Sequence, residues 1–323
     1  MKRRLLILSL ITLWISHGYV AEVRFPPETQ NAALRYWMAF AEMQDPPADK
    51  TIQDLLERTT VGQAAWNETK LGPIVEANRE ALQTMQRATK LPGCDWGLEY
   101  GRGPRTPIAY LARARVMARV NTLQAIREMA AGESQAAVER LLAGIRFSEH
   151  LANGGSLLSV LTAKSALSSV FRILTLEATK GRLTGAQKKQ ALTALRAFPE
   201  DGFNWATAWE MEGLSLETFF AELRSSEVPK AAYEASTGDV MPEGASIPAP
   251  EDLSRFRTYT AGVKAALETS PDTAKTRIEM LGTQKQALNE LIRRLVPSPQ
   301  KVNEARSEVF AARKALLVAL GAK

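Results

Sequence analysis

Apolar residues recur at every third or fourth position along almost every long segment of the chain, which is the spacing of one face of an α-helix. Alternation of apolar and polar residues at every second position, the pattern of a half-buried strand, is nearly absent. The pattern therefore predicts an all-α protein, in which antiparallel helix pairs are layered into a bundle or a solenoid-like stack.

Prolines and glycines divide the first part of the chain into segments that we expect to be helical. These segments lie at about residues 33–40, 52–58, 73–88, 107–131, 134–147 and 156–179. The two segments on either side of Gly132 are expected to form an antiparallel hairpin. The segment 156–179 is the most apolar, but Lys164 and Arg172 lie in its middle, which favours a buried core helix over a membrane span.

The second part of the chain continues the helical pattern. Its helical segments lie at about 183–198, 203–224, 251–268, 274–295 and 302–320. The last two segments have heptad-like spacing and are separated by residues 297–299, Pro-Ser-Pro, which predicts a tight C-terminal helical hairpin. Residues 225–250 contain four prolines and two glycines without periodicity, and we expect a long loop there.

Residues 1–18 have the pattern of a cleavable secretory signal peptide. Basic residues at positions 2–4 precede an apolar run at 5–15, and we expect cleavage after Gly18 or, as a second choice, after Ala21. This run is shorter than the roughly 20 residues that a spanning helix needs, so an uncleaved anchor is the less favoured alternative. No cysteine follows the run to carry a lipid. The sequence therefore predicts an exported bacterial protein, periplasmic or secreted.

Beyond this leader, three parts are expected: a helical domain at 19–224, the loop at 225–250, and C-terminal helices at 251–323 that pack on the main domain. Loss of the leader's three basic residues lowers the formal net charge from +6 to +3. The remaining basic residues are mixed with acids along helical faces, so we expect no nucleic-acid binding. Because the most apolar segment contains two basic residues, we also expect no stable membrane span once the leader is removed. A content of 45% hydrophobic and 24% charged residues is typical of a globular protein with a core.

Two local motifs resemble those of other helical proteins. Residues 132–147, a glycine-acid turn followed by small and apolar residues, resemble the second half of a single tetratricopeptide unit. The sequence Cys-Asp-Trp-Gly at 94–97, followed by a Gly/Pro linker and a long arginine-bearing helix, resembles a group of exported all-helical bacterial proteins of unassigned function. The second resemblance covers about residues 30–180. It implies export and a helical fold, and supplies no mechanism.

The histidines and the cysteine limit the chemistry that is open to the chain. His17 leaves with the leader, so His150 is the only histidine of the mature protein, and we expect no metal site and no cofactor. Near the end of a helix, His150 is expected to be a cation that meets the helix dipole. Cys94 is the only cysteine, which excludes an intramolecular disulfide and leaves a Cys94–His150 nucleophile pair as the only thiol chemistry. Signatures of serine hydrolases, phosphate loops and dinucleotide turns are absent.

Charged residues at apolar stripe positions, and aromatic or acidic residues close to them, are the remaining candidates. The candidate binding residues are Asp95, Trp96, Glu99, Arg115, Arg119, Trp205, Trp209 and Glu212. In one interpretation an acid of this set meets an arginine in a buried ion pair that fixes the loop at 91–106. Loss of Glu212 then strands a charge and costs several kcal/mol. In the other, the charges and tryptophans line a ligand pocket covered by the proline-rich loop.

Two classes of function remain open. The leading hypothesis is a non-catalytic scaffold or binding protein that presents a surface or cleft to another envelope protein, a glycan or a peptide. The alternative is an enzyme on the same helical scaffold, glycan-acting in one version, that uses Glu212 with an arginine or Asp95. A deep pocket with convergent Glu, Asp and Arg favours the enzyme, whereas a shallow apolar groove favours the binding protein.

Overall fold

The chain folds into helices throughout the part that the structure describes. The computed structural model describes residues 29–322. Over this range the chain forms fifteen α-helices and one 3₁₀ helix, and a single β-bridge between Asn31 and Gly93 stands in place of any strand. The predicted all-α fold is confirmed. The predicted leader at 1–18 lies outside the described residues.

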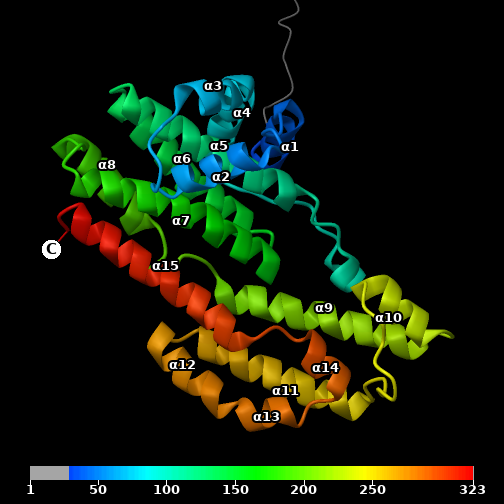
Figure 1. Ribbon diagram of the computed structural model, residues 1–323. Helices are drawn as coiled ribbons and strands as arrows, with labels where there is room; N and C mark the ends of the chain where they lie inside the picture. Colours follow the sequence, from blue (N-terminus) through cyan, green and yellow to red (C-terminus); the bar gives the residue numbers. More distant parts are fainter. Residues whose placement is uncertain (1–28, 323) are drawn as a thin grey trace, which may run out of the picture.

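Eight α-helices and the 3₁₀ helix form the first part of the molecule. They are α1 (Ala32–Glu42), α2 (Lys50–Thr60), α3 (Glu68–Ala77), α4 (Arg79–Thr89), η1 (Tyr100–Arg105), α5 (Tyr110–Ala130), α6 (Ser134–Ala152), α7 (Leu157–Thr179) and α8 (Gly185–Ala197). The α-helices lie in the upper part of Figure 1. The predicted hairpin is the pair α5 and α6, which pack against each other, and α6 packs in turn on α7.

Seven α-helices form the rest of the described chain. They are α9 (Trp205–Ser225), α10 (Pro229–Thr237), α11 (Pro250–Leu267), α12 (Pro271–Met280), α13 (Gly282–Gln286), α14 (Glu290–Leu295) and α15 (Pro299–Ala319). In Figure 1, α9 to α14 lie in the lower part, and α15 runs diagonally between the two parts. There α15 packs against α7 on one side and α12 on the other.

Short polar side chains define where many of the helices begin. They accept hydrogen bonds from backbone amides of the first turn, which have no partner inside the helix. These capping residues are Asn31, Asp49, Asn67, Ser156, Thr184, Asn204, Ser270, Asn289 and Ser298. Proline is the first residue of α10, α11, α12 and α15, a position at which its missing N–H breaks no helical hydrogen bond.

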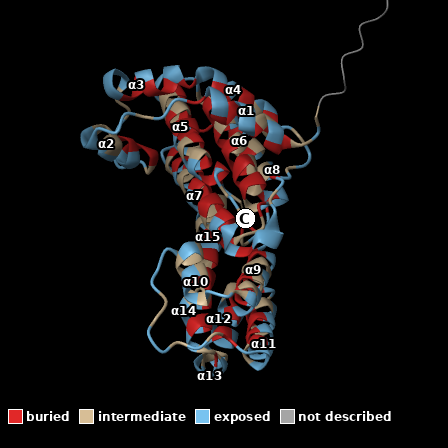
Figure 2. Cartoon of the chain, turned by 90° about the vertical axis from the view of Figure 1, so that its right-hand side faces the viewer, coloured by how far each residue is buried: buried red, intermediate tan, exposed pale blue. Residues whose placement is uncertain are grey.

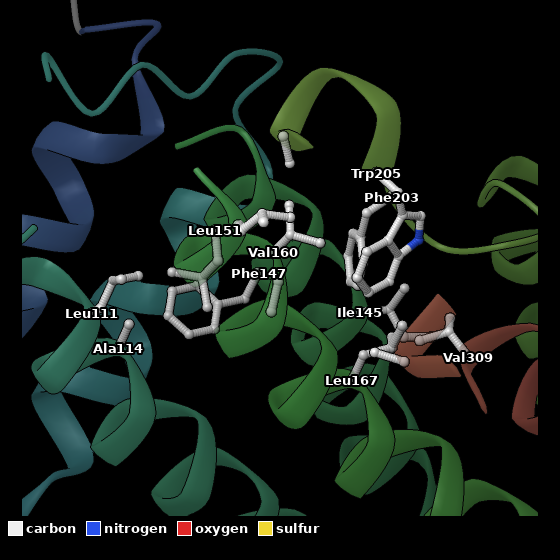
Figure 3. Packing of buried hydrophobic residues seen from close by; sticks show 14 of the residues in the cluster. Leu111, Ala114, Ile145, Phe147, Leu151, Val160, Leu167, Phe203, Trp205 and Val309 are labelled. Atoms are coloured by element: carbon white, nitrogen blue, oxygen red, sulfur yellow. The ribbon is translucent and has the colours of Figure 1, made fainter. Parts of the chain in front are cut away.

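A single hydrophobic core, with α7 at its centre, joins the two parts of the molecule. Buried residues follow the inner faces of the helices from top to bottom (Figure 2). Figure 3 shows side chains of α5, α6 and α7 together with Phe203 and Trp205 at the start of α9 and Val309 of α15. Burial of one such large side chain stabilises the fold by about 1.5–3 kcal/mol. These contacts hold α9 and α15 to the first eight helices.

One helix within residues 29–322, α7, is long and apolar enough to cross a membrane, judged by length and composition only. In its most apolar window, 61% of the residues are buried inside the molecule. Contacts with α5, α6, α9 and α15 surround it. This is the environment of a central core helix.

Three segments differ from the sequence-based expectation. The helix expected at 73–88 is divided at Asn78 into α3 and α4, and Pro73 lies inside α3 instead of beginning a helix. Residues 225–250, expected to be a loop, contain α10, which begins at Pro229 and ends before Gly238 in the left-handed conformation. The continuous helix expected at 274–295 is instead divided into α12, α13 and α14. Asn289 caps the start of α14, so the polar residue ends the helical pattern that the apolar spacing suggested.

Candidate functional site

The connection between α4 and α5 leaves the upper helices and runs along α9 before it returns to α5 (Figure 1). Gly103 makes the closest approach: its φ is +58°, and a Cβ there would lie 3.0 Å from a backbone oxygen of α9. Arg105 forms a salt bridge of 2.7 Å with Glu222 of α9. The Tyr100 hydroxyl donates a hydrogen bond to the carbonyl oxygen of Gly154, just before α7. The connection is thus fixed to both α9 and the start of α7.

A cleft of about 390 Å³ lies between this connection, the first turn of α7 and the middle of α9. Its volume is within the range of small-ligand sites. Three large apolar side chains on its walls remain accessible: Tyr100 is 39% exposed, Leu158 43% and Leu214 51%. Glycine, serine and threonine residues supply much of the remaining lining. The cleft therefore offers accessible apolar walls with a few polar groups between them.

Glu212 of α9 is the only residue among those lining this cleft that is charged at neutral pH. The backbone amide of Leu157, the first residue of α7, donates a hydrogen bond to its carboxylate. Burial raises the pKa of Glu212, and the hydrogen bond from Leu157 opposes that rise. The charge is therefore stabilised by one amide and by the positive end of the α7 dipole.

The three tryptophans predicted at the site are core residues. Trp205 and Trp209 donate their ring N–H groups to backbone carbonyl oxygens at 2.8 Å and 3.2 Å. Trp96 donates to a carbonyl oxygen of α6 at 2.8 Å, and its ring stacks on Tyr110 with 4.1 Å between centroids. Buried indole rings need such an acceptor, and all three find it inside the protein. The structure does not place them among the residues that line the cleft.

Arg115 and Arg119 are exposed on α5, so the prediction that they approach the packed face is wrong. Arg115 lies within 3.4 Å of the hydroxyl of Thr162. The buried positions of α5 are Tyr110, Leu111, Ala114, Met117, Val120, Asn121, Thr122, Leu123, Ala125 and Glu128. The predicted apolar stripe began at Ile108, which precedes α5. It therefore passed through Arg115, one position after the buried Ala114.

The acids of the α4–α5 connection are also exposed and pair locally. Glu99 lies 3.6 Å from Arg102 in a surface salt bridge, and Asp95 accepts a hydrogen bond from the amide of Gly97. The predicted buried ion pair, which joined one of these acids or Glu212 to an arginine of α5, is therefore not formed. Of the predicted binding residues, the structure brings only Glu212 into the cleft.

A buried ion pair that the sequence reasoning missed joins Glu128 of α5 to Arg140 of α6 at 2.9 Å. The two side chains are only 6% and 13% exposed, and Gln124 donates a further hydrogen bond to Glu128. Glu128 lies on the buried face of α5 with Ala114 and Met117. An apolar stripe followed through Ala114 and Met117 would have identified Glu128 as a buried acid.

A larger cavity, of about 620 Å³, lies beside this pair between α3, α4, α5 and α6. Apart from Glu133, its charged side chains are paired with one another. Arg127 lies 2.6 Å from Glu68 and 3.6 Å from Glu76, and Arg79 also contacts Glu76. Because these charges already have partners, a ligand gains less from them than from the unpaired charge of Glu212. We therefore take the cleft at α7 and α9 as the candidate site.

The only cysteine and the only histidine of the described residues both lie near Tyr36. The Tyr36 hydroxyl and His150 Nδ1 are 2.8 Å apart. Burial lowers the pKa of His150 to about 4, and burial with the nearby Asp95 raises the pKa of Cys94 to about 12. At neutral pH the thiol is therefore protonated and unreactive. His150 is neutral and buried, so its expected role as a cation at a helix end is wrong.

Metal chemistry and family relationships add no further assignment. Within residues 29–322, no group of three or more His, Cys, Asp or Glu side chains is placed to hold a metal ion. Comparison with protein-family models, characterised proteins and solved structures gives no significant match, so the candidate site is defined by its own geometry.

Proposed function

We propose that the protein is an exported, non-catalytic binding protein whose ligand occupies the cleft between the α4–α5 connection, α7 and α9. The observation that carries the proposal is the cleft itself, where accessible Tyr100, Leu158 and Leu214 surround a partly buried carboxylate. Large apolar side chains that stay accessible in one concave place are characteristic of ligand-binding surfaces. A ligand with apolar groups gains free energy by displacing water from these walls.

The arrangement of acids favours binding over glycan hydrolysis. Hydrolysis by paired carboxylates needs a second acid that faces the first across the cleft, at about 5–10 Å. Among the residues that line the cleft, Glu212 is the only acid. The other acid considered for catalysis, Asp95, is exposed on the connection and outside the lining.

The leader sequence supports a role in the cell envelope. Residues 1–18 have the pattern of a secretory signal, and residues 94–97 resemble a motif of exported helical proteins. The accessible apolar walls suit a peptide or a small molecule with apolar groups better than a glycan, whose surface is rich in hydroxyls. An envelope peptide or a small amphiphilic molecule is therefore the ligand class that we propose.

A double variant at the walls of the cleft tests this proposal. Leu158→Ser with Leu214→Ser removes apolar contacts that are already half exposed, so the fold is expected to persist. Val318→Ser is the matched control, because Val318 is 69% exposed on α15 and does not line the cleft. The three proteins are screened by thermal shift against apolar peptides, amphiphilic small molecules and glycan fragments, since a ligand that binds only the native state raises the melting temperature.

The expected result is a ligand that stabilises the wild type and the control and not the double variant. Apolar contact with each leucine contributes about 1 kcal/mol to the binding free energy, so the double variant should bind the ligand about tenfold or more weakly. The proposal is wrong if no ligand raises the melting temperature of the wild type. It is also wrong if every ligand raises the melting temperature of the double variant by as much as that of the wild type, because the cleft is then not the binding site.

A further inference from the structure

Glu212 differs from the other acids of its own helix. Of the four acids of α9, Glu210, Glu217 and Glu222 each form a salt bridge of 2.8 Å or less. Their partners are Lys264, Arg257 and Arg105. Glu212 makes no such pair with any of the residues described, although it alone of the four lines the cleft at α7. The cleft therefore contains one negative charge and no counter-ion.

The carboxylate of Glu212 retains capacity for a further hydrogen-bond donor. A carboxylate accepts about four hydrogen bonds, and the Leu157 amide uses one of these positions. Burial disfavours the charged form of Glu212, and a cation placed beside it would remove that penalty. Arg102 and Arg105 of the connection do not line the cleft, and they pair with Glu99 and Glu222 instead of Glu212.

We propose that the cleft binds a protonated amine carried on an apolar body, with Glu212 as its counter-ion. The body contacts the walls formed by Tyr100, Leu158 and Leu214, and the ammonium group donates charge-assisted hydrogen bonds to the carboxylate. In mostly apolar surroundings such a pair is stronger than in water, and an anion of the same shape is repelled. This inference rests on the proposed function and names the chemistry of its ligand.

The competing explanation is that Glu212 only caps α7. Ser156 already caps that helix by accepting a hydrogen bond from the Ser159 amide, and Glu212 takes the neighbouring amide of Leu157. A purely structural cap gives no reason for the cleft to distinguish a cation from a neutral molecule of equal size. The two explanations therefore differ in a measurable way.

The experiment compares three probes that share one body and differ in charge: 4-phenylbutylamine, 4-phenylbutanol and 4-phenylbutyrate. Their affinities for the mature chain are measured by calorimetry or ligand-observed NMR at neutral pH. We expect the amine to bind at least tenfold more tightly than the alcohol, and the carboxylate to bind most weakly. A second arm compares an acetylated Leu-Lys-Leu amide with its norleucine analogue, and shows whether the amine is carried by a small molecule or by a peptide.

Glu212→Gln tests the counter-ion directly, because glutamine keeps the shape and one oxygen for the Leu157 amide. This substitution should lower the affinity for the amine to that for the alcohol and leave the affinity for the alcohol unchanged. Glu217→Gln is the matched control on the same helix and should leave the amine affinity unchanged, since Glu217 pairs with Arg257 and does not line the cleft.

The outcomes separate this inference from the proposed function. The inference holds if the amine or the lysine peptide binds more tightly than its neutral analogue to the wild type but not to Glu212→Gln. If the alcohol binds as tightly as the amine, or if none of the probes binds, the amine proposal is overturned. The proposed function falls only if the wider screen also yields no ligand that depends on Leu158 and Leu214.

Discussion

Glu212 carries a charge in surroundings that disfavour it. Its burial raises its pKa, and the Leu157 amide at the positive end of α7 counteracts that effect. A carboxylate in a buried ion pair behaves differently, because its removal strands the partner and costs about 3–5 kcal/mol. Since Glu212 has no such partner, its removal leaves no buried charge behind, and the large loss expected from the sequence no longer follows.

Glu212→Gln should therefore stabilise the protein at pH 7. A carboxyl group whose folded-state pKa is raised contributes stability that is fully present below its ordinary pKa of 4.5 and is lost as the pH rises through the folded-state value. The melting temperature of the variant should exceed that of the wild type at pH 7, and the difference should disappear below pH 4.5. A wild type that is more stable at pH 7 would show that the charge has a stabilising partner. Glu217→Gln, which breaks the pair with Arg257, should not stabilise.

Single residues at the site were predictable where the helical phase was right. Following the stripe of α9 from Trp205 and Trp209 leads to Glu212, and that residue does line the cleft. The tryptophans could not be distinguished from ligand contacts, because a buried ring and a binding ring look alike in a sequence. On α5 the predicted buried stripe was wrong by one position, so that Arg115 and Arg119 were selected and the buried Glu128 was missed. In a helix of 3.6 residues per turn, one position is a rotation of about 100°.

At the level of elements, the α4–α5 connection forms one wall of the cleft, and its backbone conformation depends on glycine. Gly97 and Gly103 both have positive φ values, of 65° and 58°. At Gly103 the ψ of −139° adds a conformation that is almost restricted to glycine. The sequence showed a glycine- and proline-rich connection, but no pattern in it revealed that it would pack on α9, because that contact is made by backbone.

Gly103→Ala should destabilise the protein more than Gly97→Ala. Both substitutions place an L-residue at positive φ, which costs about 1 kcal/mol. A Cβ at Gly97 has no heavy atom within 4 Å, whereas a Cβ at Gly103 lies 3.0 Å from the Ser215 carbonyl oxygen. We expect the unfolding free energy to fall by about 1 kcal/mol for Gly97→Ala and about 2–3 kcal/mol for Gly103→Ala. The free energies are measured by urea denaturation.

Displacement of the connection should also show in limited proteolysis. Trypsin should cut after Arg102 and Arg105 faster in Gly103→Ala than in Gly97→Ala, because both arginines lie on the displaced segment. Equal stability and equal cleavage rates in the two variants would mean that the contact with α9 does not hold the connection in place.

At the level of the whole molecule, the sequence indicated that C-terminal helices pack on the main domain but not which helices meet. Apolar stripes define the buried face of a helix and leave its partner open. In the structure, α15 packs against α7, more than a hundred residues earlier, as well as against α12. The predicted stripe of α15 with Val302, Val309 and Leu316 is buried, but nothing in the sequence indicates that its partner is α7.

Export can be tested on the full-length chain expressed in a bacterium. The mass of the protein from the periplasmic fraction should correspond to loss of residues 1–18, with Tyr19 as the new N-terminus, or to a start at Glu22 as the second choice. A variant that lacks residues 2–18 should remain in the cytoplasm. Recovery of the intact precursor from the cytoplasm would contradict export and with it the envelope role.

The position of α15 also determines when the chain can complete its folding. Helix α15 completes the packing around α7. Until α15 has been synthesised, one apolar face of α7 is therefore uncovered. We therefore expect the nascent polypeptide to be a client for chaperones, and a product shortened before residue 299 to be a target for quality-control proteases. We expect the packing around α7 to be completed only after the C-terminal helix has been synthesised.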